Sequence, residues 1–95
     1  DWVARYGGEE FLIVFPETDI ECARQPTERI RKRFSKRVLE MEGKNIVITA
    51  SFGITGFDPN TPDQEITPDT MIRKADKYLY RAKREGRNRC RLGQL

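Results

Sequence analysis

The sequence predicts an α+β domain, and three observations support that prediction. Two apolar runs, at 2–6 and 11–15, flank a Gly-Gly pair, which is typical of a β-hairpin. Residues 20–41 and 67–86 carry apolar side chains at intervals of three and four, as amphipathic helices do. Residues 45–55 place an apolar side chain at every second position, as in a strand with one face on the core.

The composition fits one small folded domain, which we expect to span residues 1–95. Charged residues make up 35% of the chain and hydrophobic ones 37%, a balance that argues against disorder. No histidine is present, which excludes Ser-His-Asp and Cys-His catalysis. Cys22 and Cys90 lack the spacing of a zinc site and suit a reduced, cytoplasmic setting. The chain opens inside a strand without an initiator methionine, so we expect it to be a piece of a longer protein.

The first element is expected to be a hairpin over residues 1–15, with Gly7 and Gly8 as a two-residue turn. That register places Arg5 opposite Glu10, where the two would form an ordinary cross-strand ion pair worth about 0.2–1 kcal/mol. Glutamate is depleted in strands, however, and here two glutamates begin one. The spacing alone therefore leaves a structural and a functional interpretation of these carboxylates open.

The second strand, 11–15, is apolar on both faces, so we expect it to lie inside a sheet. A helix should follow, because Thr18 and Glu21 have the spacing of a capping box. Its apolar pattern continues to residue 41, and Gly43 is a plausible stop. Pro26 lies well inside the pattern and predicts a kink or a late start to the regular helix.

The strand over residues 45–55 contains Gly53, which indicates a bulge or a close packing contact. Residues 58–68 contain three prolines among acidic and small residues and are expected to form an exposed loop. Thr67 should then cap a second helix, with Pro68 in its first position.

The second helix is expected to end at Gly86, with a short final strand over 88–92. Basic residues gather at this end of the helix: Lys83, Arg84, Arg87, Arg89 and Arg91. They would compensate the helix dipole by about 0.3–1 kcal/mol, or they would form a nucleic-acid patch. Nucleic acid is not favoured as a partner, because no aromatic side chain is interleaved for base stacking.

Three blocks of the chain resemble, in order, motifs of the GGDEF family, the diguanylate cyclases of bacterial signalling. They are the hairpin signature Ala4–Phe11, the strand Thr49–Ile54 with its Thr-Ala-Ser-Phe-Gly run, and the helix and exit Ala75–Asn88. With the intervening helix they cover essentially the whole chain, which corresponds to the C-terminal portion of the family's domain. The resemblance implies condensation of two GTP molecules into cyclic di-GMP plus pyrophosphate.

The resemblance also implies a fold. The family's domain is a ferredoxin-like nucleotidyl cyclase palm, an antiparallel sheet with helices packed on it. It begins with a strand that carries a metal-binding aspartate, followed by helices that contact guanine, and none of these lies in this chain. We therefore expect a partial palm that lacks its first strand. The isolated fragment should be inactive, although the parent protein would be a cyclase.

By resemblance, Glu9 holds Mg²⁺ (or Mn²⁺) and activates the attacking 3′-hydroxyl, with Glu10 in a supporting catalytic role. Mg²⁺ takes oxygen ligands from few carboxylates plus substrate phosphates, which suits this position. The remaining members of the implied substrate site keep the turn open for nucleotide, bind the triphosphate or assist there: Gly7, Gly8, Arg5, Lys83 and Arg87.

A second, inhibitory site for cyclic di-GMP is implied at Asp1 and Arg29. Asp1 stands where relatives carry the aspartate of an Arg-x-x-Asp motif, and Arg29 matches a helical arginine that contributes to it. For Arg29 a solvated helix face remains the alternative.

Two hypotheses about function follow from the resemblance. The first is an active cyclase that works as a homodimer, each domain presenting one GTP, under the control of an upstream sensory domain. The second is a non-catalytic module that binds GTP or cyclic di-GMP and signals through partners. An intact Gly-Gly-Glu-Glu-Phe favours the first. In either case we expect a cytoplasmic domain, whether or not the parent protein is anchored in the membrane.

Overall fold

The computed structural model describes residues 2–8, 10–60 and 66–95. The elements follow the order β1 (Trp2–Gly7), β2 (Glu10–Val14), α1 (Ile20–Lys36), β3 (Val38–Met41), β4 (Lys44–Val47), β5 (Phe52–Gly56), α2 (Pro68–Arg84) and β6 (Cys90–Gln94). Strands and helices are thus mixed along the chain, and the expected α+β class is confirmed.

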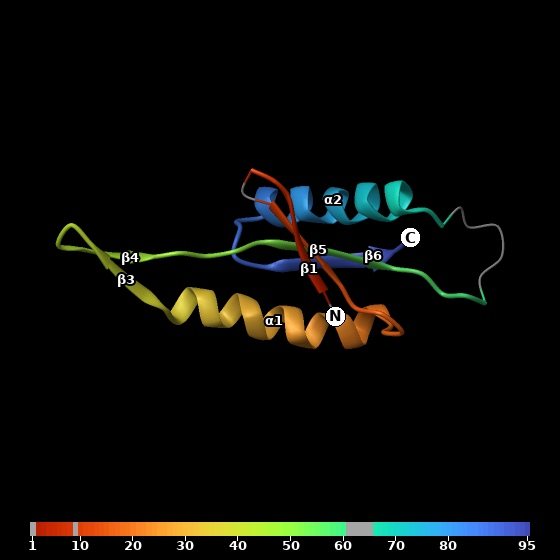
Figure 1. Cartoon of the computed structure of the whole chain (residues 1–95), viewed down its shortest axis with the longest axis horizontal. Helices are drawn as coiled ribbons and strands as arrows, with labels where there is room; N and C mark the ends of the chain where they lie inside the picture. The colour runs from red at the N-terminus through yellow and green to blue at the C-terminus, as the bar shows by residue number, and fades with distance from the viewer. Residues whose placement is uncertain (1, 9, 61–65) are drawn as a thin grey trace.

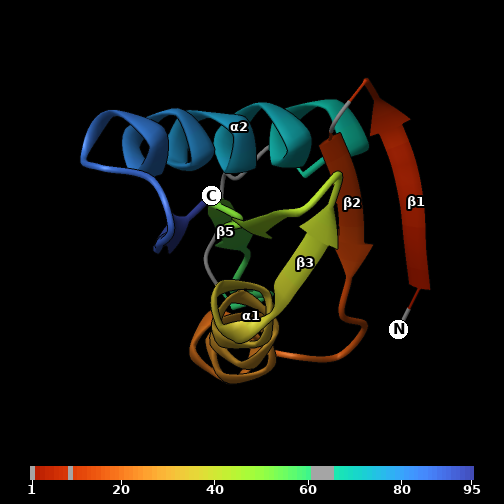
Figure 2. The same cartoon turned by 90° about the vertical axis from the view of Figure 1, so that its left-hand side faces the viewer.

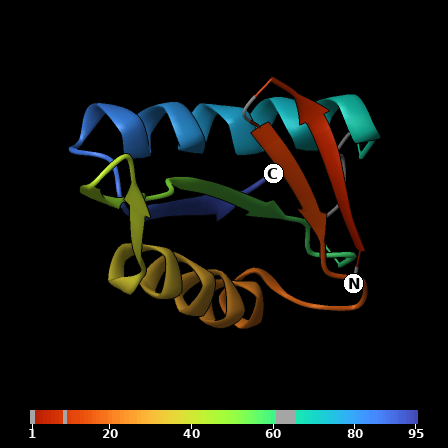
Figure 3. The same ribbon diagram turned by 60° about the vertical axis from the view of Figure 1, so that its left-hand side comes forward.

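The described strands form three separate pairs. β1 with β2 and β3 with β4 are antiparallel hairpins, whereas β5 and β6 pair in parallel. The two helices lie on opposite sides of the β5–β6 pair, with α2 above and α1 below it in Figure 1, and Figure 3 shows the same layering. The β3–β4 hairpin extends beyond the end of α1, and the molecule measures 55 × 24 × 21 Å (Figure 1).

The core lies between α1 and the β5–β6 pair. Its buried members are Ile20 and Ala23 from α1, Ile54 from β5 and Cys90 from β6. Half-buried apolar side chains pack around this cluster: Phe15, Phe52 and Leu92. The cluster is small, as expected for a chain of this length.

Gly53 allows α2 to pack closely on the other side of β5. A Cβ at this position would overlap the Ala75 carbonyl oxygen and the Leu79 amide nitrogen, and it would stand 2.9 Å from Leu79 Cα. The close packing contact that was one of two interpretations of Gly53 is therefore confirmed.

The register of the first hairpin differs from the expected one. Gly7 pairs with Glu10, and Arg5 pairs with Phe11, with an irregularity between Arg5 and Gly7. The turn is therefore displaced by one residue, and the predicted cross-strand pair of Arg5 and Glu10 is wrong. β2 is also not inside a sheet, because β1 is its sole partner among the described strands and Phe11 is 66% exposed.

The first helix is shorter than predicted at its C-terminal end. Its N-cap is Asp19, whose carboxylate accepts a hydrogen bond from the Cys22 amide at 2.8 Å, so the expected capping box on Thr18 is wrong. The helix starts at Ile20 and continues as one element through Pro26, so the late start is also wrong. The helix ends at Lys36 instead of continuing to residue 41.

A hairpin replaces the expected end of that helix. β3 and β4 are joined by Glu42 and Gly43, with φ of 52° and 76°. Positive φ at both central residues matches the right-handed twist of a two-residue hairpin. The expected strand over 45–55 is accordingly divided, because its first part pairs with β3 and its second part with β6.

The second helix agrees closely with the prediction. Thr67 is its N-cap, its hydroxyl accepts a hydrogen bond from the Thr70 amide at 3.1 Å, and Pro68 stands in the first turn. The helix ends at Arg84, and Gly86 follows with a φ of 124°. The last strand begins two residues later than expected. Neither described helix is long and apolar enough to cross a membrane.

Candidate functional site

The tip of the first hairpin presents Gly8, which directly follows the last residue of β1, beside exposed side chains. Gly8 has a φ of 39°, and its carbonyl oxygen accepts two hydrogen bonds from the Arg5 guanidinium, from Nε at 3.2 Å and Nη2 at 3.0 Å. The Arg5 side chain therefore links β1 to the backbone of the turn that follows it. Glu10 is exposed. The predicted catalytic residue Glu9 and the predicted inhibitory residue Asp1 lie outside the described residues.

Two cations near the C-terminal end of α2, Lys83 in its last turn and Arg87 in the loop that follows, have no side-chain partner among the described residues. Lys83 and Arg87 are both exposed, and neither side chain makes a hydrogen bond or ion pair with another described residue. The neighbouring basic residues are engaged instead. Arg84 donates to the Tyr80 hydroxyl at 3.2 Å, and Arg91 pairs with Glu85 at 2.7 Å. Arg89 donates through Nε to the Arg87 carbonyl at 3.0 Å. Lys83 and Arg87 are thus the members of the basic cluster whose side chains make no hydrogen bond or ion pair with a described residue.

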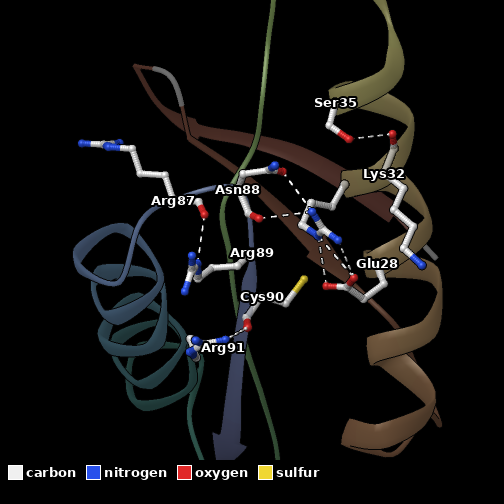
Figure 4. Close-up of polar contacts among 9 residues, drawn as sticks. Glu28, Lys32, Ser35, Arg87, Asn88, Arg89, Cys90 and Arg91 are labelled. Atoms are coloured by element: carbon white, nitrogen blue, oxygen red, sulfur yellow. Dashed lines mark hydrogen bonds and ion pairs between the residues drawn. The ribbon is translucent and has the colours of Figure 1, made fainter.

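A network between the two helices fixes the loop that carries Arg87. Arg31 on α1 donates through Nη1 to the backbone oxygen of Asn88 at 3.1 Å and to its Oδ1 at 3.0 Å. The Asn88 amide donates to the Ser51 hydroxyl at 3.0 Å. Figure 4 shows Asn88 directed toward α1 and Arg87 directed away from it.

Neither Arg31 nor Ser51 has a role predicted from the sequence. A signal was nevertheless present, because Ser51 and Asn88 fall inside the second and third family-like blocks. Arg31 gave no comparable signal. Its role depends on a contact across 57 residues of chain, which helical spacing cannot indicate.

The loop is held in an uncommon backbone conformation. Arg87 and Asn88 have φ of 61° and 47°, in the left-handed region, which costs non-glycine residues about 1–3 kcal/mol each. Asparagine tolerates this region better than arginine does. The Arg87 amide donates to the Ala82 carbonyl at 3.0 Å, and the Arg89 carbonyl accepts from the Phe52 amide at 2.9 Å. The loop is therefore restrained from α2, from β5 and, through Arg31, from α1.

Glu28 supplies the negative charge that faces Arg31 in this network. The Arg31 guanidinium and, to a lesser extent, the Cys90 thiol lower the pKa of Glu28 to about 2, so this carboxylate is ionised at neutral pH. Arg31 and Glu28 meet at 2.9 Å, with side chains 18% and 29% exposed. Burial and the Glu28 carboxylate raise the pKa of Cys90 to about 12, so its thiol stays protonated.

The structure does not bring the two predicted halves of the site together. In Figure 1 the hairpin turn overlaps the C-terminal end of α2, but Figure 2 shows them on opposite sides of the molecule. Within the described residues, no three Asp, Glu, Cys or His side chains gather closely enough to hold a metal ion. Arg29 is exposed on α1, where it lines a shallow hollow with Gln25 and Lys32.

Comparison with known proteins identifies the family. Residues 1–89 match the family described as "Diguanylate cyclase, GGDEF domain". The chain belongs to the GGDEF family. It is 40% identical over 89 residues to diguanylate cyclase DgcP of Pseudomonas aeruginosa, covering 94% of this chain and 12% of that protein. It is 42% identical over 93 residues to diguanylate cyclase DosC of Escherichia coli K12, covering 97% of this chain and 19% of that protein.

Solved GGDEF domains share the fold. The chain superimposes on the crystal structure of the DgcB GGDEF domain from Caulobacter crescentus, in complex with c-di-GMP, with a TM-score of 0.83 and 33% identity. That match covers 96% of this chain and 52% of the other. The active GGEEF domain of a Vibrio cholerae diguanylate cyclase gives a TM-score of 0.75 and 35% identity over 96% of this chain and 55% of that one. The chain thus spans about half of these domain structures, and less of its full-length relatives.

Proposed function

We propose that this GGDEF chain is part of a diguanylate cyclase domain, which condenses two GTP into cyclic di-GMP and releases pyrophosphate. The observation that supports this most is the intact Gly7-Gly8-Glu9-Glu10-Phe11 signature in a chain whose α2 end presents two uncommitted cations. The signature supplies carboxylates, and Lys83 and Arg87 supply positive charge for a triphosphate. Phosphoryl transfer depends on the positioning of the reacting groups and on stabilisation of the negative charge on the phosphoryl oxygens, which the carboxylates with their metal and the two cations would supply.

The roles of the residues follow from that chemistry. Lys83 and Arg87 would hold the triphosphate, each through charge-assisted hydrogen bonds. Gly7 and Gly8 would let the nucleotide approach the backbone, and Glu10 would support Glu9. Glu9 is proposed as a ligand of Mg²⁺, which supplies positive charge against the phosphoryl oxygens when bound. Two domains, each presenting one GTP, would act as a homodimer in the cytoplasm.

Replacement of Glu9 by Gln in the full-length protein tests this proposal. The substitution removes one negative charge with little change of shape. We expect cyclic di-GMP production from GTP to fall by at least about two orders of magnitude, because the variant cannot offer a carboxylate to the metal. The matched control is Glu40→Gln, which changes an exposed glutamate on a strand of the other hairpin and should leave turnover unchanged.

Near-normal turnover by the Glu9→Gln variant would contradict the assignment. GTP binding without any turnover by the unmodified full-length protein would favour the non-catalytic binding module instead. Alanine at Lys83 or Arg87 should weaken GTP binding by about 10-fold to 150-fold, the range for a lost charge-assisted hydrogen bond. Lys77→Ala, on the exposed side of the same helix, is the control and should bind GTP normally.

Regulation by the product is part of the proposal. The DgcB domain was crystallised with c-di-GMP, and the cyclase SiaD of Pseudomonas aeruginosa with its activator SiaC, so relatives bind both product and protein partners. We place a product-binding site at Asp1 and Arg29. Arg29 is exposed and makes no ion pair with a described residue. An upstream sensory domain would control the output.

A further inference from the structure

Arg31 uses all three of its donor nitrogens, one to reach the loop after α2 and two to bind Glu28 on its own helix. Nη1 donates to both oxygens of Asn88, while Nε and Nη2 donate to the Glu28 carboxylate at 3.2 and 2.9 Å. The side chain is 18% exposed, so water competes little for these donors. Lysine cannot reproduce this arrangement, because one ammonium lacks the planar fork that reaches two partners at once.

The loop needs such restraint because of its backbone. Arg87 and Asn88 are consecutive residues in the left-handed region, and such conformations persist only where surrounding contacts determine them. Among the described residues, Arg31 is the side chain that engages both the backbone and the side-chain oxygen of Asn88, and Ser51 engages its amide. Removal of Arg31 would leave Asn88 held from the β5 side alone.

The geometry of the loop determines where Arg87 points. Its guanidinium is exposed and makes no hydrogen bond or ion pair with a described residue, so the backbone at 87 and 88 determines the side of the loop from which the side chain leaves. Figure 4 shows the two side chains leaving the loop in opposite directions, so that anchoring Asn88 toward α1 directs Arg87 away from it. Because the loop backbone is already ordered, binding of an anion at Arg87 loses only the conformational freedom of the side chain and not that of the loop.

We propose that Arg31 is a positioning residue for GTP: through Asn88 it holds the 86–89 loop in the shape that presents Arg87 to the triphosphate. The inference rests on the proposed function, since it needs Arg87 to bind GTP. GTP affinity would then depend on a residue of α1 that does not itself contact GTP. Ser51, immediately before β5, accepts a hydrogen bond from the backbone amide of the same asparagine.

A double-mutant cycle in the full-length protein tests this role. GTP affinity is measured by titration calorimetry for the unmodified protein, Arg31→Gln, Arg87→Ala and the double variant, with thermal unfolding of each. We expect Arg31→Gln to weaken GTP binding by about tenfold and the double variant to bind no more weakly than Arg87→Ala. Arg31→Lys should behave like Arg31→Gln. Arg24→Gln is the control, because Arg24 lies on the same helix in an exposed ion pair with Glu21 at 3.8 Å.

Each result decides the question. Unchanged GTP affinity in folded Arg31→Gln, or losses that add in the double variant, would overturn the positioning role while leaving the proposed function intact. Unchanged affinity in Arg87→Ala would overturn the positioning role together with the proposed triphosphate contact of Arg87, whereas the cyclase activity itself is decided by Glu9→Gln. If Arg31→Gln fails to fold, Ser51→Ala replaces it in the cycle, since it removes the second restraint on Asn88 without a buried charge. Additive loss in that cycle would likewise overturn the inference.

Discussion

Gly53→Ala should destabilise the domain because β5 and α2 meet at backbone distance. The added Cβ would overlap the Ala75 carbonyl oxygen and the Leu79 amide nitrogen, and would lie 2.9 Å from Leu79 Cα. These atoms belong to a helix backbone, which cannot move aside as a flexible side chain can. Overpacking costs about 1–3 kcal/mol, and rigid partners place this case near 3 kcal/mol. Alanine restricts the unfolded chain and returns about 0.4–1 kcal/mol, so the net loss is about 2 kcal/mol.

Gly56→Ala provides a matched control on the same strand. Its Cβ would lie 3.6 Å from Ile20 Cβ, an ordinary van der Waals distance. The variant should be unchanged or stabilised by up to about 1 kcal/mol, because the unfolded-state effect then acts alone. Urea denaturation of the complete GGDEF domain measures both free energies of unfolding. Equal stability of the two variants would refute the account of how α2 packs on β5.

Three further predictions concern charge, thiols and completeness. The pKa of Glu28 is lowered from 4.5 to about 2, so its contribution to stability is full above pH 4.5 and is lost as pH falls toward 2; acid denaturation of Glu28→Gln should lack this dependence. At about pH 8 iodoacetamide should modify exposed Cys22 and leave buried Cys90, with its pKa of about 12, unmodified until unfolding; equal labelling of the folded protein would contradict this burial. The isolated chain should form no cyclic di-GMP from GTP and Mg²⁺, and its mass in solution should exceed that of a monomer, because β2 and β5 each keep an edge without a partner among the described strands; product formation would show that the site is complete.

The sequence predicted best those elements whose signals are local. The cap at Thr67, Pro68 in the first turn, and the end of α2 before Gly86 each depend on residues within one turn. The first helix was predicted too long, because Val38 and Met41 continue a spacing of three and four that also fits a short strand. Short apolar runs are ambiguous in this way, and Glu42-Gly43 supplies the turn that decides it.

The candidate site was predicted through motifs, and its supporting contacts were not. Lys83 and Arg87 were chosen because they match a pattern, and the structure shows that both are uncommitted among the described residues. The pairing of Arg5 with Glu10 was wrong because a one-residue shift of the turn changes every partner in a hairpin. Arg31 was missed because its partner Asn88 lies 57 residues away.

The two halves of the candidate site are held by different means, and this difference explains their separation. The half around Arg87 is restrained from α1, α2 and β5 by contacts within the described residues. The hairpin half pairs with itself alone, and both β2 and β5 keep one edge without a described partner. A strand inserted between β2 and β5 would satisfy both edges at once. We expect the first strand of the palm that the resemblance implies, with its metal-binding aspartate, to occupy this place. We therefore expect the hairpin carboxylates and the cations Lys83 and Arg87 to form one site only in a domain that includes that strand.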